Sequence, residues 1–442
     1  MNQRFGEGKI RENMSRFFLH RAGSPVLCAF VIGFVFFATG TAYAEELNLQ
    51  ELIDEALRNS PDILASQSRV SASEYRIPQA KSLPDPVVGV GYQNEGWNKY
   101  SFGDMQMSWW AFSATQMFPF PGKLSLREEI ATKDTERLQE SHSSLKLKVR
   151  AKVKELYFDL FFAHKDIDIL KDRAALFARI EDAAQARYSA GMGQQEEVLL
   201  AQTEKYILLE KEEFQKQKIQ SLEGMLNAAI GRDVSSPLGK PAEPLYIPYG
   251  RTLDELVGIA YQNSPEIKSK ERMIAGAEAK VKLAEKGYYP DFTVTAEVMK
   301  RAGEFDDIWS LTTAINIPLF YKTKQRQEVN EAKASLLEAR SELEATKLML
   351  SSSIRDDYST IKTAESLMGL YKNGLIPKTY QDFELAIAGY VTGKVEAITT
   401  IDRLKALLDY ETLYWRQLVE REKAIARIEA VTAVSDSGLG GK

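Results

Sequence analysis

The feature that most constrains the fold of this chain is a run of 67 residues, at positions 124–190, that contains neither glycine nor proline. The run is rich in leucine, lysine, glutamate, arginine and alanine, which favour helix. As one α-helix at 1.5 Å per residue it would extend roughly 100 Å, which no compact single domain accommodates. Apolar residues recur along it at spacings of three and four, so we expect partner helices along its length, as in a coiled coil or helical barrel.

Two segments about two hundred residues apart have nearly the same sequence. Residues 49–63 read LQELIDEALRNSPDI and residues 253–267 read LDELVGIAYQNSPEI, with eight of fifteen positions identical. Unrelated segments would share about one. The separation is too long for a solenoid repeat, so it indicates two copies of a whole structural unit.

Each copy follows the same predicted plan of a leading helix, a β-hairpin, an outgoing helical arm, a glycine turn and a returning arm. The first copy is predicted at residues 45–231, with its hairpin at about 87–118 and its helical pair at about 122–230. The second is predicted at 252–430, with its hairpin at about 291–317 and its helical pair at about 322–430. A linker at 232–251 and a disordered tail at 431–442 complete the division.

The first 44 residues predict a cleaved signal peptide. Residues 26–37 are apolar, arginines precede them, and Ala42-Tyr43-Ala44 has the small-x-small form of a signal peptidase site. A membrane anchor is the less favoured alternative, because the apolar run is shorter than the ~20 residues that span a bilayer. Met1 and Met14 both remain possible starts.

Cysteine content and charge exclude several classes of function. The single cysteine, Cys28, lies in the predicted signal peptide, so the mature chain has no thiol for catalysis, disulfides or thiolate metal sites. Removing residues 1–44 takes away five basic and two acidic residues and leaves a net charge of −8. An exported, acidic chain of this kind argues against nucleic acid as a partner.

The two predicted hairpins alternate apolar with small or polar residues, the period-2 pattern of strands with one apolar face. Four of the five tryptophans lie in or beside them, as expected of membrane-interface aromatics: Trp97, Trp109, Trp110 and Trp309. Strands of about ten residues with aromatic ends are typical of outer-membrane β-barrels, although a soluble sandwich shows the same alternation.

The number of predicted strands favours an oligomer. Four strands cannot close a barrel, because bacterial barrels need at least ~8. Open sheet edges are excluded from lipid, so strands that enter a membrane must find partners on other copies. Three copies would supply twelve strands, and a homotrimer in outer-membrane lipid is therefore the natural hypothesis.

Taken in order, these features resemble the TolC-type outer-membrane efflux protein family over essentially the whole mature chain. The motifs that carry the resemblance are the duplicated opening, the strand-ending Pro119 and Pro318, the Ile376-Pro377 break, and the turns RYSAG (187–191) and GYVTG (389–393). The resemblance implies a mainly α fold with a long helical barrel in the periplasm and a twelve-stranded β-barrel completed by a homotrimer. It also implies a passive exit duct without a cofactor, serving a periplasmic adaptor and an inner-membrane pump.

The same resemblance implies that gating residues lie at the helix turns of a periplasmic tip. Glu197 and Asp402 take acidic positions by their spacing from the turn glycines, and Tyr390 matches a tip tyrosine. Val395 and Thr399 depart from the family pattern, where some members carry an arginine and an acid, so a closed-state lock of the same kind is in doubt. The remaining candidates at the turns are Tyr188, which could equally pack beneath its turn, Lys394, and the glycines Gly191, Gly193 and Gly393.

An enzyme is not predicted. The mature chain has only His142 and His164, whose spacing matches no contiguous zinc motif, and nucleotide-binding or nucleophile-elbow motifs are absent from strand-to-helix contexts. Methionines near the first hairpin and at a turn raise the alternative of soft-metal contact in a heavy-metal export branch: Met105, Met107, Met117 and Met192.

The rival hypothesis is a periplasmic coiled-coil adaptor or scaffold without a membrane barrel. Such a protein would also be exported and rich in long helices. Adaptors, however, carry glycine- and valine-rich lipoyl-like halves, whereas this chain has two tryptophan-marked amphipathic hairpins. The channel is therefore the favoured interpretation.

Overall fold

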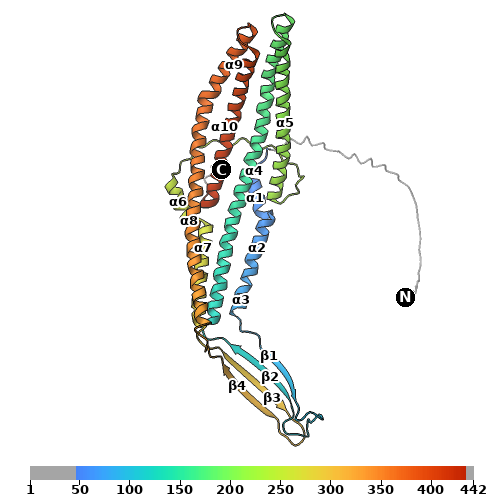
Figure 1. Cartoon of the computed structure of the whole chain (residues 1–442), viewed down its shortest axis with the longest axis vertical. Coiled ribbons are helices and arrows are strands. Elements are labelled where there is room, and N and C mark those ends of the chain that lie inside the picture. The colour runs from blue at the N-terminus through green and yellow to red at the C-terminus, as the bar shows by residue number, and fades with distance from the viewer. Residues whose placement is uncertain (1–45, 435–442) are drawn as a thin grey trace, which may run out of the picture. The chain divides into compact units, whose positions relative to one another are not determined.

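The computed structural model describes residues 46–434, all of which belong to one compact unit (Figure 1). The predictions for the signal peptide, for Cys28 and for residues 435–442 fall outside the described residues. The described part is mainly helical with four strands, and its elements occur twice in the same order, which confirms the predicted fold class and the duplication. None of the helices between residues 46 and 434 is both long and apolar enough to cross a bilayer.

The first copy contains α1 (Leu49–Asn59), α2 (Pro61–Glu74), α3 (Arg76–Lys81), β1 (Val87–Gln93), β2 (Trp109–Phe118), α4 (Lys123–Ser189) and α5 (Gln195–Ile230). The second contains α6 (Leu253–Asn263), α7 (Pro265–Lys286), β3 (Phe292–Lys300), β4 (Ile308–Ile315), α8 (Gln325–Leu370), η1 (Tyr371–Leu375), α9 (Ile376–Val391) and α10 (Ala397–Thr432). The long glycine-free run forms the single helix α4, as the sequence predicts.

The duplicated Asn-Ser-Pro motif ends one helix and starts the next. Ser60 and Ser264 both have φ −57° with ψ near 120°, outside the helical region, and each is followed by a proline at the first helical position. Proline disfavours helical geometry in the residue before it but fits the start of a helix. Both serines are buried, so the motif fixes an equivalent bend in each copy.

The predicted break in the second outgoing arm is a local change of winding, not a reversal of the chain. The helix passes from α8 through the π-helical turn η1 into α9, with Gly374 inside the turn and Pro377 in the first turn of α9. Pro377 has no N–H to donate to the preceding turn, and the wider turn η1, in which Ile376 N–H donates to Tyr371 C=O, lies directly before it. The arm therefore continues as helix from Gln325 to Val391, in place of the expected interruption.

Helices α4 and α10 pack antiparallel, and their charged pairs record the register. Moving along α4, Lys154 pairs with Glu429, Asp159 with Lys423 and Arg173 with Glu411, so the partner moves steadily back along α10. Beside and between these pairs lie buried apolar residues of α4: Val153, Leu156, Leu160 and Ala163. Burial of the apolar residues stabilises the contact between α4 and α10, and the charged pairs fix the register of one helix against the other.

Asp166 is a further polar residue buried on α4. Its carboxylate accepts hydrogen bonds from Gln215 Nε2 at 2.8 Å and from Thr412 Oγ1 at 3.1 Å. Burial raises the pKa of Asp166, and the bond from Thr412 opposes that rise. The Oε1 atom of Gln215 is buried and has no hydrogen-bond partner among the described residues. Asp166 thus joins α4 to both α5 and α10 at an electrostatic cost.

The four strands form one antiparallel sheet in the order β1-β2-β3-β4, so the two copies meet at β2 and β3. A row of residues crosses all four strands on one face: Val90 pairs with Phe112, which pairs with Val298, which pairs with Trp309. The opposite face carries small and polar residues, including Gly89, Ser113 and Thr295. The sheet is therefore apolar on one side only, as the alternation predicts.

Candidate functional site at the helix turns

The turns α4–α5 and α9–α10 have the same backbone hydrogen bonds. In the first, Gly191 N–H donates to Tyr188 C=O at 3.0 Å and Met192 N–H to Arg187 C=O at 2.9 Å. In the second, Gly393 N–H donates to Tyr390 C=O at 3.0 Å and Lys394 N–H to Gly389 C=O at 2.9 Å. Both are Schellman motifs, which need a left-handed residue after the helix.

The turn glycines Gly191 and Gly393 take that position with φ of +72° and +76°. A side chain there would be strained whatever space surrounds it. Gly193, the third predicted turn glycine, has no such φ and is needed for a different reason, which is the space beside Arg187.

The first and last residues of each turn lie in contact, and one of the two is a glycine. It is the last residue in the first turn, Gly193, and the first residue in the second turn, Gly389. A Cβ on Gly193 would lie 3.1 Å from the Cβ of Arg187, and a Cβ on Gly389 would lie 2.5 Å from Cγ2 of Val395. Arg187 aligns with Gly389, and Gly193 with Val395. The same backbone thus leaves room for one large residue per turn, on opposite sides in the two copies.

A polar network joins the two turns. The hydroxyl of Tyr390, on α9, donates to Glu197 Oε2, on α5, at 2.9 Å. Arg187, on α4, donates through Nη1 to the Tyr390 carbonyl at 2.8 Å and through Nη2 to the Met192 carbonyl at 2.9 Å. Its guanidinium lies 5.0 Å from the centre of the Tyr390 ring, and its Nε is 3.9 Å from Glu197 Oε2.

The phenol at the centre of the network is shielded from water, while Arg187 and Glu197 remain partly exposed. Tyr390 is fully buried and packs with Ala184, Val198 and Ala397, so the polar contacts lie over a small apolar cluster. Burial, together with the bond to the Glu197 carboxylate, raises the pKa of Tyr390, although Arg187 opposes that rise. The phenol is therefore held as a neutral donor, and it joins the hairpin α4–α5 to the hairpin α9–α10 at their ends.

Of the predicted gating side chains, the structure joins Glu197 and Tyr390 and leaves Asp402, Tyr188 and Lys394 outside the network. Asp402 is exposed on α10, and no hydrogen bond or ion pair holds its side chain within residues 46–434. Tyr188 is 44% exposed, and Lys394 is exposed on its turn. Two predicted acids that seemed equivalent by spacing therefore have different environments.

The sequence reasoning missed Arg187, the residue with the most contacts in the network. It precedes Tyr188 in the motif RYSAG, and its counterpart in the second turn is Gly389. The available signal was that asymmetry, since one turn carries an arginine where the other has glycine. Arg187 of the first turn therefore places a positive charge against the second turn, where it donates to the Tyr390 carbonyl.

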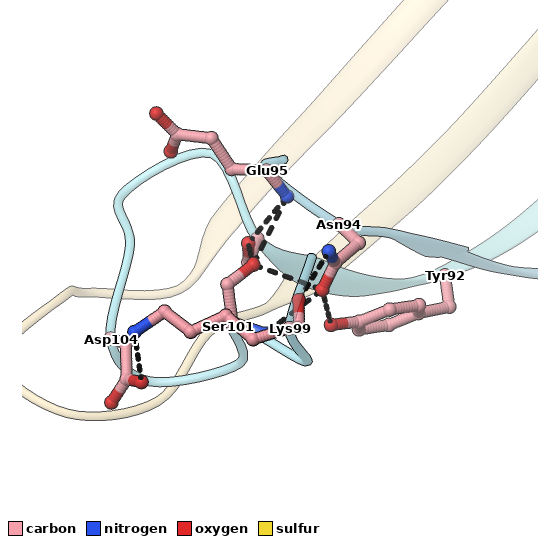
Figure 2. A network of polar contacts seen from close by, with 7 residues as sticks. Tyr92, Asn94, Glu95, Lys99, Ser101 and Asp104 are labelled. Atoms are coloured by element: carbon pink, nitrogen blue, oxygen red, sulfur yellow. Dashed lines mark hydrogen bonds and ion pairs between the residues drawn. The ribbon is translucent and has the colours of Figure 1, made fainter. Parts of the chain in front are cut away.

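At the end of the sheet away from the helices, the β1–β2 loop is held by an internal hydrogen-bond network (Figure 2). Asn94 Oδ1 accepts from the Tyr92 hydroxyl at 2.6 Å and from the Ser101 N–H at 2.9 Å, while Asn94 Nδ2 donates to the carbonyls of Gly96 and Lys99. The buried Ser101 also donates from its hydroxyl to Asn94. The loop is therefore built from its own contacts.

The predicted interface tryptophans all lie at or near this loop end. Trp110 and Trp309 are on the apolar face of the sheet, where Trp110 packs against Tyr92 with ring centres 5.0 Å apart. Trp97 is fully exposed in the β1–β2 loop. Trp109, one residue before Trp110 on β2, points to the opposite face and does not share their surroundings.

The candidate metal ligands do not gather into one site. Met105 and Met107 lie in the β1–β2 loop, Met117 near the helix end of β2, and Met192 at the α4–α5 turn. His142 and His164 are 22 residues apart on one helix, which separates them by about 33 Å. Within residues 46–434, no group of three or more His, Cys, Asp or Glu side chains is arranged to hold a metal ion.

Comparison with known proteins decides the family. Residues 52–231 and 256–412 match the sequence profile described as outer membrane efflux protein, in two segments that lie one in each copy of the duplicated unit. The chain belongs to the outer membrane efflux protein family. The TolC-type resemblance inferred from its motifs is confirmed.

Two curated members of similar length are related to this efflux protein. It is 22% identical over 403 residues to the cobalt-zinc-cadmium resistance protein CzcC of Cupriavidus metallidurans, covering 88% of this chain and 90% of that protein. It is 22% identical over 411 residues to the pyoverdine export outer membrane protein OpmQ of Pseudomonas putida, covering 87% and 85%. The outer membrane protein VceC of Vibrio cholerae has the same fold, with a TM-score of 0.74 at 16% identity over 88% of this chain and 97% of that one.

Family membership settles several predictions. The protein is an outer-membrane efflux channel that extends into the periplasm, and its family is one of channels, not of enzymes. The adaptor alternative is wrong, because the family profile covers both copies of the unit. The sheet and the helix turns lie at opposite ends of the 67-residue helix α4 (Figure 1).

Proposed function

We propose that three copies of this chain form the exit duct of a tripartite efflux system, with a periplasmic adaptor and an inner-membrane pump as partners. The observation that carries the proposal is the four-stranded sheet, which is apolar on one face and pairs β1 and β4 on one side only within the described residues. In lipid, each unpaired edge needs a strand from another copy. Three copies in a ring satisfy all edges with twelve strands.

A semi-native gel tests the trimer directly. Outer-membrane fractions are expected to contain a species about three times the mass of the chain that collapses to one chain on boiling. A product that fractionates as a soluble monomer would refute the proposal. Adaptor and pump partners are tested separately, by co-purification after crosslinking in cells that carry the neighbouring export genes.

At the periplasmic end, the turn network is proposed to hold the entrance closed. Three contacts between the hairpins α4–α5 and α9–α10 support this role: the Tyr390–Glu197 bond, the Arg187–Tyr390 bond, and the Lys405–Glu204 ion pair at 2.5 Å. Opening the entrance would separate the hairpins and break these contacts. Arg187 therefore replaces, from the first copy, the arginine that the second turn lacks.

Asp402 is proposed to form an acidic ring at the entrance. Its exposed side chain lies nine residues past Gly393 and five residues into α10, which is about 8 Å along that helix at 1.5 Å per residue. Three such carboxylates around one axis would attract cations and disfavour anions. Glu197 is a poorer candidate for the ring, because its carboxylate already accepts the Tyr390 hydroxyl.

Single-channel recordings in planar bilayers test the ring. Asp402→Ala is expected to lower cation selectivity and to relieve block by multivalent cations. The matched control is Asp409→Ala, which removes the same charge from an exposed position two helical turns farther from the tip. If the two variants behave alike, Asp402 has no special place in the entrance.

A divalent metal cation is the proposed cargo class. CzcC is named for cobalt, zinc and cadmium resistance and OpmQ for pyoverdine export, so relatives at the same identity differ in cargo. An acidic ring at the entrance favours the cation. Deletion of the gene is then expected to sensitise cells to cobalt, zinc or cadmium. Unchanged metal tolerance with lost pyoverdine release would assign the protein to the second class.

A further inference from the structure

The two copies of the unit can be aligned residue by residue where strands meet helices. Pro290-Asp291 before β3 matches Pro84-Asp85 before β1, and Pro119 after β2 matches Pro318 after β4. The sheet supports this alignment independently, because the hairpins have the same register. Val88 pairs with Ala114 in the first hairpin, and their counterparts Val294 and Thr313 pair in the second.

In the middle of the chain, the end of the first hairpin is fastened to the start of the second. Lys123 Nζ donates to Asp291 Oδ1 at 2.8 Å and to the Tyr289 carbonyl at 3.0 Å. The Phe120 N–H donates to the same Asp291 oxygen at 2.7 Å, and the Phe120 ring stacks on Tyr289 with centres 4.6 Å apart. The side chains of Lys123 and Asp291 are only 10% and 14% exposed, so this is a buried, charge-assisted junction.

The counterparts of these residues lie at opposite edges of the sheet. By the alignment, Lys322 corresponds to Lys123 and Leu319 to Phe120, both after β4, while Asp85 corresponds to Asp291 and Leu83 to Tyr289, both before β1. All four are exposed, with Leu319 at 74% and Leu83 at 45%. Within residues 46–434, neither Lys322 nor Asp85 makes a side-chain hydrogen bond or ion pair.

The helix after β4 also begins late. Helix α4 starts at Lys123, but α8 starts at Gln325, three residues beyond the position that corresponds to Lys123. The intervening segment, residues 319–324, forms turns. In the first copy the same stretch is held by its contacts with Tyr289 and Asp291, which directly precede β3. In the second copy no segment of the described chain lies in the corresponding place beyond β4.

We propose that Lys322 of one copy pairs with Asp85 of the next copy, and that Leu319 packs on Leu83 of the next copy. The inference rests on the proposed trimer and adds the residues that close it. Around three copies there are six junctions, of which three are the Lys123–Asp291 junctions inside each chain. The remaining three are the same junction made between chains.

The alignment also fixes the register of β4 against β1 of the next copy. Trp110 and Lys300 are paired between β2 and β3, as are Phe112 and Val298. Their counterparts place Leu311 opposite Tyr92 of the next copy, with both side chains on the apolar face. A shift by one residue would turn one apolar set inward, so lipid enforces this register.

Charge reversal tests the pair. Lys322→Glu and Asp85→Lys are each expected to lower the temperature at which the trimer dissociates on semi-native gels, because each places like charges together at a partly dehydrated junction. The double variant is expected to recover most of the loss. The matched control is Lys324→Glu, an exposed lysine two residues away that the alignment places outside the junction.

Cysteine crosslinking gives a second readout that does not depend on stability. The mature chain is predicted to lack cysteine, so Asp85→Cys combined with Lys322→Cys is expected to yield covalently linked copies under oxidation, whereas Asp85→Cys with Lys324→Cys is not. A wild-type trimer with no crosslink and no rescue by the double reversal would overturn the pairing and leave the trimer intact. A wild-type monomer would overturn both.

Discussion

Removing the Tyr390 hydroxyl is the sharpest test of the turn network. Tyr390→Phe keeps the buried ring, its apolar neighbours and its contact with the Arg187 guanidinium, but it deletes the donor to Glu197. A hydrogen bond to a charged acceptor contributes about 1.5–3 kcal/mol. The Glu197 side chain is 25% exposed, so water can partly replace the lost donor and the lower end, about 1.5 kcal/mol, applies.

That magnitude converts to a shift in the closed-to-open ratio of about tenfold for each copy. Single-channel recording is expected to show a larger open fraction in Tyr390→Phe than in the parent protein. Tyr188→Phe is the matched control, because Tyr188 occupies the equivalent turn position, is 44% exposed, and its hydroxyl has no hydrogen bond within residues 46–434. Equal open fractions in the two variants would show that the bond does not hold the entrance.

Three further predictions concern stability, measured by thermal melting. Arg427→Met leaves the buried Asp357 without its cation; because Arg427 is itself 37% exposed, we expect a loss of about 3 kcal/mol, largely recovered when Asp357→Leu is added. Burial raises the pKa of Asp166, so its ionised carboxylate destabilises the fold at neutral pH, and this penalty disappears as the pH falls below the folded pKa toward 3.8. Asp166→Asn is therefore expected to be more stable than the parent at pH 7, by a margin that shrinks toward pH 4. A margin that stays constant with pH would contradict this. Gly389→Ala places a Cβ 2.5 Å from Val395 and is expected to cost about 1–3 kcal/mol, with Val395→Ala restoring most of it.

Much of the fold could be predicted because its strongest signals are local and periodic. The glycine-free run became α4, and the alternating segments became β1–β4 with the expected apolar face. The η1 turn could not be predicted in the same way. Gly374 and Pro377 indicate a weak point in a helix, but they do not show whether the chain reverses there or only changes its winding. That outcome depends on the neighbouring helix α10, whose Tyr410 packs against Tyr371 of η1.

The candidate site was predictable in place but not in its contacts. Spacing from Gly191 and Gly393 located both turns, since a left-handed residue after a helix nearly requires glycine. Spacing could not show that Glu197 is bonded to Tyr390 while Asp402 is exposed, because that difference arises where the two hairpins meet. Residues that touch across separate elements leave no periodic trace in one sequence.

The duplication makes the backbones of the two turns equivalent, yet their side chains divide one task between them. The first turn supplies the cation and the acid, Arg187 and Glu197, and the second supplies the buried phenol of Tyr390. Because neither turn is complete alone, the network can form only while α4–α5 and α9–α10 lie side by side. The divergence of the two copied segments thus builds a contact between the two hairpins of each chain, which is what the proposed closed entrance requires.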